Sequence, residues 1–262
     1  MPSPHLRSKM LEALIKKSLA DFYQRRSEKL NGLNLADTLR SKNPYLFRAK
    51  GIQKASEIVS ELLQAYISSS DETIFGDAFF EPIAKSVSGG QVGGGEGVDV
   101  IREDEATVTV IAVKSGPNWG NADQWKRQKQ NFESLRHRLQ KLHKQFDPLM
   151  GYGYGRRNTD PTAKRHYRQR SGQAFWEELT GEPDFYLKLI RLMKDYPQKH
   201  RRLYQAAWDK AVNRFDREFL MNFATPGGDI DWERFVEFNS GKAKPRFSRE
   251  AADASERGSS TP

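Results

Sequence analysis

The chain has 262 residues and a formal net charge of +9. The length allows one large domain or two small ones. The charge favours a polyanionic partner such as nucleic acid, with a basic surface without a partner as the alternative. The chain has no cysteine, and its five histidines show no zinc-binding spacing, which excludes disulfides, thiolate zinc sites and a cysteine nucleophile and makes a histidine zinc site unexpected. No apolar run approaches the roughly 20 residues that cross a bilayer, and no signal-sequence core is found, so we expect a cytoplasmic protein.

Helices are expected through the first third of the chain. Apolar residues at helical spacing predict an amphipathic helix from Leu6 to about Lys29 and another from Ala49 to Ser68, which Ser69 to Asp71 then end. Residues 75–87 predict a further short helix, kinked or restarted at Pro82.

A glycine-rich stretch and a hairpin follow. The stretch SGGQVGGGEG, residues 88–97, is too rich in glycine to form a regular element, and it lacks the helix or strand context of a phosphate-binding loop. We interpret it as a flexible, DNA-facing loop. The segments VDVI and TVTVIAVK, separated by the charged turn REDEA, predict a β-hairpin.

The remaining elements are predominantly helical. A helix is predicted from about Ala122 to Phe146, a third strand over PLMGYGYG, and a capped helix over SGQAFWEELTG that ends at Gly181. Further helices follow, and the composition from Gly241 onward is typical of a disordered tail. The order helices, hairpin, helix, strand, helices predicts an α/β core with helices at both ends.

Two side chains of the hairpin are candidates for chemistry. Asp99 lies in its first strand and Lys114 ends its second, so antiparallel pairing can bring them together. A carboxylate beside a lysine can hold Mg²⁺ and polarise a water. One or two carboxylates, together with a backbone carbonyl and waters, are enough to bind Mg²⁺. The alternative is an ordinary surface ion pair.

Seven segments carry a resemblance to a known group of proteins. They are KNPYLFRAKGI at 42–52, SSSDETIFGDAFFEPIA at 68–84, GVDV at 97–100, VIAVKSGPNWGN at 110–121, GYGYG at 151–155, SGQAFWEELTG at 171–181 and DWERFVEFNSG at 231–241. The octet KSGPNWGN is the most specific, because no general structural requirement demands it. Together the segments resemble the PD-(D/E)XK nuclease superfamily and, more narrowly, the PmeII-like type II restriction endonucleases.

The resemblance implies roles for individual residues. Asp99 matches the first acid of the superfamily motif and Lys114 its lysine, whereas Ala112 stands where the second acid is expected. Glu81 resembles the helical acid that replaces it in some relatives, in space that Ala112 leaves open, and Glu96 is the weaker candidate. The implied ligands of Mg²⁺ are Asp99, Glu81 and the carbonyl of Val113, while an inactive homologue is the alternative.

DNA contacts are expected from two segments after the hairpin. The first contains Asn118, Trp119 and Asn121, for which turn formation and packing are the alternative. It also contains Gln124, which resembles the glutamine that many superfamily members place beside the metal. The second is a basic loop, with a solvated loop as the alternative; its candidates are Arg156, Arg157, Lys164, Arg165, Arg168 and Arg170.

The resemblance implies a Mg²⁺-dependent type II restriction endonuclease. Its fold would be a PD-(D/E)XK nuclease-like core, a small mixed sheet flanked by helices, within a single domain over 1–240 (core about 72–195) and with a disordered tail over 241–262. A homodimer would cut a short palindromic site in double-stranded DNA, and a cognate methyltransferase gene would lie nearby. The alternatives are a repair or resolvase-like nuclease and a non-catalytic DNA-binding homologue.

Overall fold

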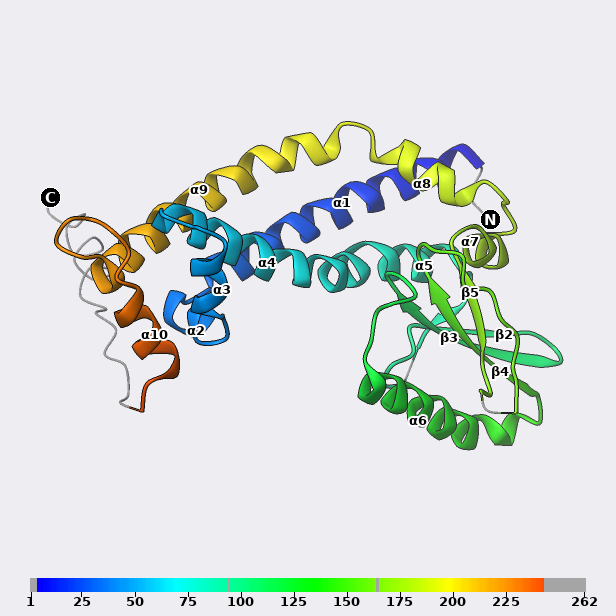
Figure 1. Cartoon of the computed structure of the whole chain (residues 1–262). Helices are drawn as coiled ribbons and strands as arrows, with labels where there is room; N and C mark the ends of the chain where they lie inside the picture. Colours follow the sequence, from blue (N-terminus) through cyan, green and yellow to red (C-terminus); the bar gives the residue numbers. More distant parts are fainter. Residues whose placement is uncertain (1–3, 94, 164, 243–262) are drawn as a thin grey trace, which may run out of the picture. The chain divides into compact units, whose positions relative to one another are not determined.

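The structure is a computed structural model that describes residues 4–93, 95–163 and 165–242 (Figure 1). Contacts divide the chain into two compact units. One comprises Ser70–Arg201 together with the chain up to Arg25, and the other comprises Arg26–Ser69 together with the chain from Arg202 onward. The single domain expected over 1–240 stays a prediction, and the tail expected over 241–262 lies, from residue 243, outside the described residues.

A five-stranded mixed sheet forms the centre of the first unit. Its order is β1-β2-β3-β4-β5, with β1, β2 and β3 antiparallel and with β4 and β5 parallel to β3. The parallel register places the C-terminal ends of β3, β4 and β5 at the same end of the sheet. The strands are β1 (Gln91–Val92), β2 (Val100–Glu103), β3 (Thr107–Lys114), β4 (Gln145–Tyr152) and β5 (Arg168–Ser171).

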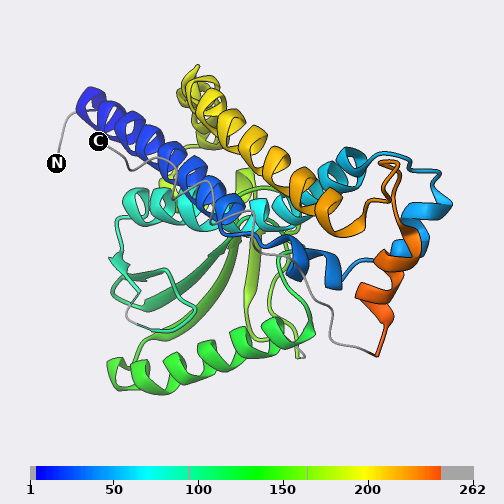
Figure 2. The ribbon, with the colours of Figure 1, turned by 90° about the vertical axis from the view of Figure 1, so that its left-hand side faces the viewer.

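Helices cover both faces of this sheet (Figures 1 and 2). One face is covered by α6 (Ala122–Leu139), which the short 3-10 helix η2 (Gln140–Leu142) follows. The other face is covered by the π-helical turn η1 (Gly76–Phe80), by α5 (Glu81–Val87) and by α7 (Gln173–Thr180). This unit also contains α8 (Phe185–Met193) and the first residues of α1 (Pro4–Asn31).

The side chains of β3 alternate between two apolar cores. Ile111 and Val113 belong to the core under η1, α5 and α7, whereas Val110 and Ala112 belong to the core under α6. This is the period of two that a strand imposes on its side chains. Because helices cover both faces, β3 is a nearly continuous apolar run that ends at Lys114.

The GYGYG motif lets aromatic rings approach the end of β4. A Cβ atom at Gly153 would lie 2.5 Å from the ring of Phe80, so only glycine fits there. The indole of Trp176 also donates a hydrogen bond to the carbonyl oxygen of Gly153, at 2.9 Å. The motif therefore packs η1 and α7 against the end of the sheet that carries Lys114.

The second unit is entirely helical among its described residues apart from one isolated bridge. Its aromatic core includes Phe219, Phe223 and Phe235, and Asn34 and Asn43 cap its two shortest helices. No described helix of the protein is both long and apolar enough to span a membrane. The helices of this unit are α2 (Leu35–Arg40), α3 (Pro44–Ala49), α10 (Trp232–Ser240) and the larger parts of α4 (Ala55–Phe75) and α9 (Tyr196–Phe223).

The hairpin, the third strand and most helices are confirmed, but four expectations about elements were wrong. The helix expected from Ala49 begins at Ala55 and continues through Ser69–Asp71, because its apolar stripe leads into η1 without a break. The helix expected to reach Phe146 ends at Leu139, since His143 adopts a left-handed conformation (φ 52°) and β4 then begins.

The other two wrong expectations concern short strands. The glycine-rich stretch contains β1, whose two residues pair with β2. The basic connection contains β5, which pairs with β4, so Arg168 and Arg170 lie in a strand and not in a loop. Neither segment contains an apolar run from which a strand could be predicted. Each is a strand because its backbone pairs with a neighbouring strand of the sheet.

Candidate active site

Asp99 is held against the end of β3 by two hydrogen bonds. It lies one residue before β2, where its backbone N–H donates to the carbonyl oxygen of Ile111 at 2.8 Å. Its Oδ2 accepts the backbone N–H of Val113 at 2.7 Å. The Asp99 carboxylate therefore lies beside the residue that precedes Lys114, as antiparallel pairing of the hairpin requires.

Glu81 reaches the end of β3 from the helices that cover the face of the sheet opposite to α6. It is the first residue of α5, directly after η1, and its carboxyl group interacts electrostatically with that of Asp99. Lys85, one turn later, forms an ion pair with Glu81, and its Nζ lies 3.8 Å from Asp99 Oδ1. The structure thus brings Glu81 and Asp99 together and adds Lys85, which the sequence analysis missed.

The two carboxyl groups titrate differently. Burial raises the pKa of Asp99 to about 6; the adjacent Glu81 adds to the rise, while the Val113 N–H and Lys114 oppose it. Burial also acts to raise the pKa of Glu81, but its hydrogen bonds with Lys85 and Asp99 lower this pKa below the ordinary value. Glu81 is therefore the first of the pair to ionise, and Asp99 stays protonated to higher pH.

Lys114 supplies a positive charge at the end of β3. It interacts electrostatically with Asp77, Glu81 and Asp99, and its Nζ lies 5.1 Å from the centroid of the Trp119 ring. A cation over an indole is attracted by the ring quadrupole. Trp119 therefore helps to position Lys114 beside the two acids.

Two further acids near this point were not predicted. Burial raises the pKa of Asp77, in η1; Glu81 adds to the rise and Lys114 opposes it. The spacing of four residues between Asp77, Glu81 and Lys85 is a signal that could have identified this polar stripe. Glu72 accepts hydrogen bonds from Ser115 Oγ (2.7 Å) and the Tyr154 hydroxyl (3.3 Å), but it lies beyond the predicted end of its helix.

Ala112 lies in the core on the face of the sheet opposite to the helices that carry Glu81. It is fully buried in the apolar core under α6, whereas Glu81 follows η1 and α5, which pack in the core on the opposite face. The role of Glu81 as the acid that replaces the one absent at Ala112 stays a prediction.

Glu96 points elsewhere. It forms an ion pair with Arg127 of α6, and its side chain is 69% exposed. The glutamine that lies next to this loop is Gln128, whose Nε2 donates to the carbonyl oxygen of Gly97 at 2.8 Å. Gly97 has φ +72°, and a Cβ there would lie 2.3 Å from Asn131. Gln128 thus fixes the backbone two residues before Asp99.

Asn121 and Gln124 serve the start of α6. The Oδ1 of Asn121 accepts the backbone N–H of Gln124 at 3.0 Å, and the Oε1 of Gln124 accepts the backbone N–H of Asn121 at 2.9 Å. This reciprocal capping box satisfies backbone donors that a helix start leaves free. The DNA contacts implied for these two residues stay predictions.

The predicted basic segment begins beside the turn that follows Lys114. Arg156 and Arg157 are both exposed. Arg157 donates from Nη1 to the carbonyl oxygen of Pro117 at 2.8 Å, and its Nη2 lies 3.5 Å from Asn118 Oδ1. These two arginines and Asn118 therefore lie on the same side of the unit as the candidate site.

The middle of the basic segment folds back on itself. Arg165 donates from Nη2 to the carbonyl oxygen of Asp160 at 2.8 Å, and its guanidinium lies 5.8 Å from the centroid of the Tyr167 ring. Lys164, a predicted DNA contact, lies outside the described residues.

The end of the basic segment forms ion pairs within the protein. Arg168 donates to both carboxylate oxygens of Asp147 and to both of Glu178. Arg170 pairs with Asp160 at 2.6 Å. These contacts place both guanidinium groups in protein networks, and the DNA contacts predicted for them stay untested.

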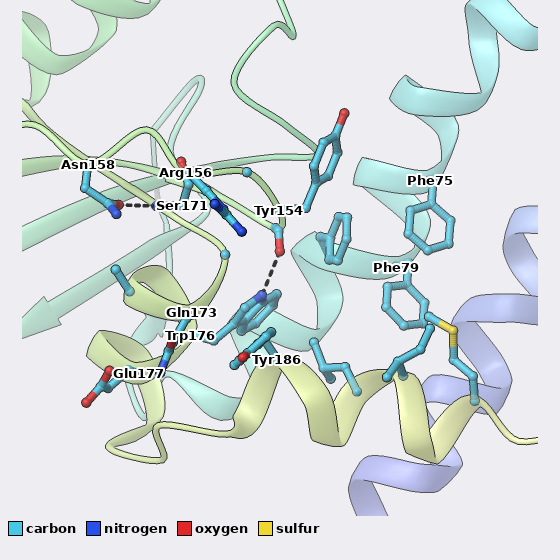
Figure 3. Close-up of a pocket in the computed structure, with 18 residues that line it drawn as sticks. Phe75, Phe79, Tyr154, Arg156, Asn158, Ser171, Gln173, Trp176, Glu177 and Tyr186 are labelled. Atoms are coloured by element: carbon cyan, nitrogen blue, oxygen red, sulfur yellow. Dashed lines mark hydrogen bonds between the residues drawn. The ribbon is translucent and has the colours of Figure 1, made fainter.

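A cavity of about 950 Å³ lies next to the end of β4. Figure 3 shows Trp176 in the wall of this cavity, where its indole donates to the carbonyl oxygen of Gly153, directly after β4. Arg156 and Asn158 lie on one side of the cavity, and Phe75 and Phe79 on another. Of the described residues that line this cavity, none is Glu81, Asp99 or Lys114. This cavity is therefore a neighbour of the candidate site and not the site itself.

A family model described as "Type II restriction endonuclease EcoO109I" matches residues 9–201. The chain belongs to this family. No curated protein matches the chain. The match covers the whole sheet and the candidate site, so the expectation of a type II restriction endonuclease is confirmed at this level. The mixed sheet flanked by helices also confirms the PD-(D/E)XK nuclease-like fold.

The residues of this endonuclease fit a Mg²⁺ ion. Among the described residues, no three His, Cys, Asp or Glu side chains gather into a complete metal cage. Mg²⁺ does not need one, because it keeps several waters and binds through one or two carboxylates and substrate phosphates. The ammonium group of Lys85 already lies against both carboxylates, so the space accepts a cation. The carbonyl of Val113 stays a predicted ligand.

Proposed function

We propose that this endonuclease hydrolyses phosphodiester bonds in double-stranded DNA at a short palindromic site, with Mg²⁺ bound by Asp99 and Glu81. The observation that carries the proposal is the convergence of Glu81, Asp99 and Lys114 at one end of the sheet, from three elements distant in sequence. The octet KSGPNWGN and the other matching segments further suggest that it belongs to the PmeII-like group of type II enzymes.

Each residue has a defined task in this proposal. Glu81 and Asp99 bind the ion, which when bound polarises a water and the scissile phosphate. Lys114 orients the attacking water or offsets the negative charge that develops on the phosphate oxygens. The hydrogen bond from the Val113 N–H keeps one oxygen of Asp99 fixed, so that the other faces Glu81 and the substrate.

DNA would approach the end of the sheet at which β3, β4 and β5 terminate. Arg156 and Arg157 are the arginines best placed to contact phosphates there, and Asn118 is exposed beside them. Arg165 lies three residues before the start of β5, towards the other end of that strand, and remains part of the proposal at lower weight. Contacts from Trp119, Asn121, Gln124, Lys164, Arg168 and Arg170 remain part of the proposal at lower weight, because five of these side chains already serve the fold.

The proposal also covers the oligomeric state of the enzyme, its location in the cell and its partner methyltransferase. A palindrome is read by two identical surfaces, so a two-fold homodimer is required. Residues 1–240 would act as one nuclease domain in the cytoplasm. A DNA methyltransferase encoded nearby would protect the host DNA.

A second candidate is a non-catalytic DNA-binding homologue, which the replacement of the second motif acid by Ala112 favours. A repair or resolvase-like nuclease of the same superfamily is a third. Incubation of the purified protein with a plasmid of known sequence and Mg²⁺ separates all three. Discrete fragments of constant length support restriction, structure-dependent nicking supports repair, and intact plasmid with retained DNA binding supports the non-catalytic homologue.

A further inference from the structure

Lys85 lies where a metal ion would have to bind. Its Nζ forms an ion pair with Oε1 of Glu81 and lies 3.8 Å from Oδ1 of Asp99. All three side chains are largely shielded from solvent, with exposed fractions of 28% for Lys85, 26% for Glu81 and 14% for Asp99. The two predicted ligands therefore already share a cation that belongs to the chain.

The oxygen atoms involved make this contact exclusive. Asp99 Oδ2 is engaged by the Val113 N–H, so Oδ1 is the oxygen that remains for an incoming cation. Oδ1 is also the oxygen nearest to Lys85, and Glu81 is engaged through Oε1. An ammonium group and a metal ion would compete for the same two oxygens, because two cations cannot share them without strong repulsion.

The local sequence places Lys85 there. Glu81 and Lys85 are four residues apart in α5, with the acid first, which is the favourable order for a helical ion pair. Partly buried carboxylates this close repel one another unless a cation lies between them. Lys114 approaches the acids from β3 but rests on the Trp119 ring, which leaves Lys85 as the cation in direct contact.

We propose that Lys85 is an internal counter-cation that holds Glu81 and Asp99 in place in the metal-free enzyme and is displaced when the divalent metal binds. This inference rests on the proposed function. The lysine side chain is partly exposed, so its ammonium group can move to solvent while its methylene groups stay packed. Displacement breaks an ion pair, so Lys85 weakens metal binding and sets the metal concentration at which the site fills.

The test uses the full-length protein without DNA and titrates it with Mn²⁺ at about pH 8 by calorimetry. Lys85→Met removes the charge and keeps the length of the side chain, and should bind Mn²⁺ about fivefold more tightly than the wild type. Lys85→Arg keeps the charge and should bind like the wild type. Lys188→Met is the matched control, since Lys188 pairs with Glu182 at 2.7 Å outside the site.

Thermal unfolding provides a second readout. Without metal, Lys85→Met should melt at a lower temperature than the wild type, and the difference should vanish in saturating Mn²⁺ because the ion replaces the lysine. If Lys85→Met does not fold without metal, Lys85→Gln takes its place in both measurements. A difference that persists in saturating Mn²⁺ would make Lys85 a structural residue and overturn the inference.

The remaining outcomes separate this inference from the proposed function. Mn²⁺ binding by Lys85→Met that equals or falls below that of the wild type overturns the role of Lys85 and leaves the metal site intact. Absence of Mn²⁺ binding by both proteins overturns the metal site itself, and the role of Lys85 with it.

Discussion

Two charged clusters lie at opposite ends of the parallel strands, and they are built in opposite ways. The arginine cluster, formed by Arg168, Asp147 and Glu178 near the start of β4 and β5, is fully paired, since one guanidinium donates to all four carboxylate oxygens. The acid–lysine cluster, formed by Glu81, Asp99 and Lys114, has two adjacent acids whose nearest cation is a lysine from outside the motif.

The titration of the two clusters reflects this difference. The hydrogen bonds with Asp147, followed by those with Glu178, raise the pKa of Arg168 despite its burial, so its charge is stabilised by the fold. In the acid–lysine cluster burial raises the pKa of Asp99 to about 6, so the fold disfavours its charge. A carboxylate in this state gains most when a divalent cation arrives, which supports the proposal that the second cluster is the functional one.

The largest effect is expected from Lys114→Ala. Cleavage should fall by about a thousandfold, because the variant lacks the group that orients water or offsets phosphate charge, while folding and DNA binding persist. Asp99→Ala should have the same result through loss of the metal. Plasmid cleavage, gel-shift binding and thermal unfolding of each variant provide the measurements.

The arginine cluster is the control for this prediction. Arg168→Ala leaves the partly buried Asp147 without its ion-pair partner and Glu178 with only the longer pair to Arg170, so the free energy of unfolding of the variant should fall by about 2–3 kcal/mol. At a temperature where the variant is folded, cleavage should continue. If Lys114→Ala cleaved at nearly the wild-type rate, or if Arg168→Ala were stable but inactive, the assignment of the two clusters would be reversed.

A smaller effect is expected from Glu81→Gln. The amide keeps the volume and loses the charge, so the Mg²⁺ concentration needed for half-maximal cleavage should rise at least about tenfold without unfolding. Glu178→Gln should lower stability and leave the Mg²⁺ requirement unchanged. A raised requirement in Glu96→Gln, with Glu81→Gln unaffected, would transfer the role of second ligand to the exposed glycine-loop acid.

The sequence predicted the hairpin that places Asp99 beside Lys114, because alternating apolar residues and a charged turn define the register of two neighbouring strands. It could not predict how α4, η1 and α5 join, since that depends on packing of η1 against the end of β4. Lys85 was therefore missed although its spacing from Glu81 was visible. β5 was missed as well, because arginine and glutamine carry no strand signal until Asp147 and Glu178 pair with them.

The pH dependence of metal binding sharpens the comparison further. Asp99 must lose its proton to bind a metal ion, and its pKa lies at about 6. Mn²⁺ affinity should therefore be constant well above this pH and decrease by up to about tenfold for each unit below it. Because the pKa in the folded state exceeds the unfolded value, Asp99 also destabilises the metal-free protein as pH rises towards 6.

Calorimetric titration between about pH 5 and 8 measures this effect, with Asp99→Asn as the control. The variant should bind Mn²⁺ weakly at every pH, and its metal-free form should lose less stability than the wild type as pH rises through this range. An Mn²⁺ affinity of the wild type that does not change with pH would contradict the raised pKa of Asp99.

The smallest effects are expected from single arginines of the basic segment. Arg156→Ala, Arg157→Ala and Arg165→Ala should each weaken DNA binding only a few-fold, since each removes one phosphate contact. The slope of log affinity against log salt concentration should decrease by about 0.9 for each lost contact, and the effects should add in the triple variant. Arg168→Ala is again the informative comparison. The guanidinium of Arg168 is enclosed by Asp147 and Glu178, so its removal should leave the slope unchanged. If the slope changed in Arg168→Ala and Arg165→Ala but in neither Arg156→Ala nor Arg157→Ala, DNA would lie across the end of the sheet that carries the arginine cluster, away from Lys114.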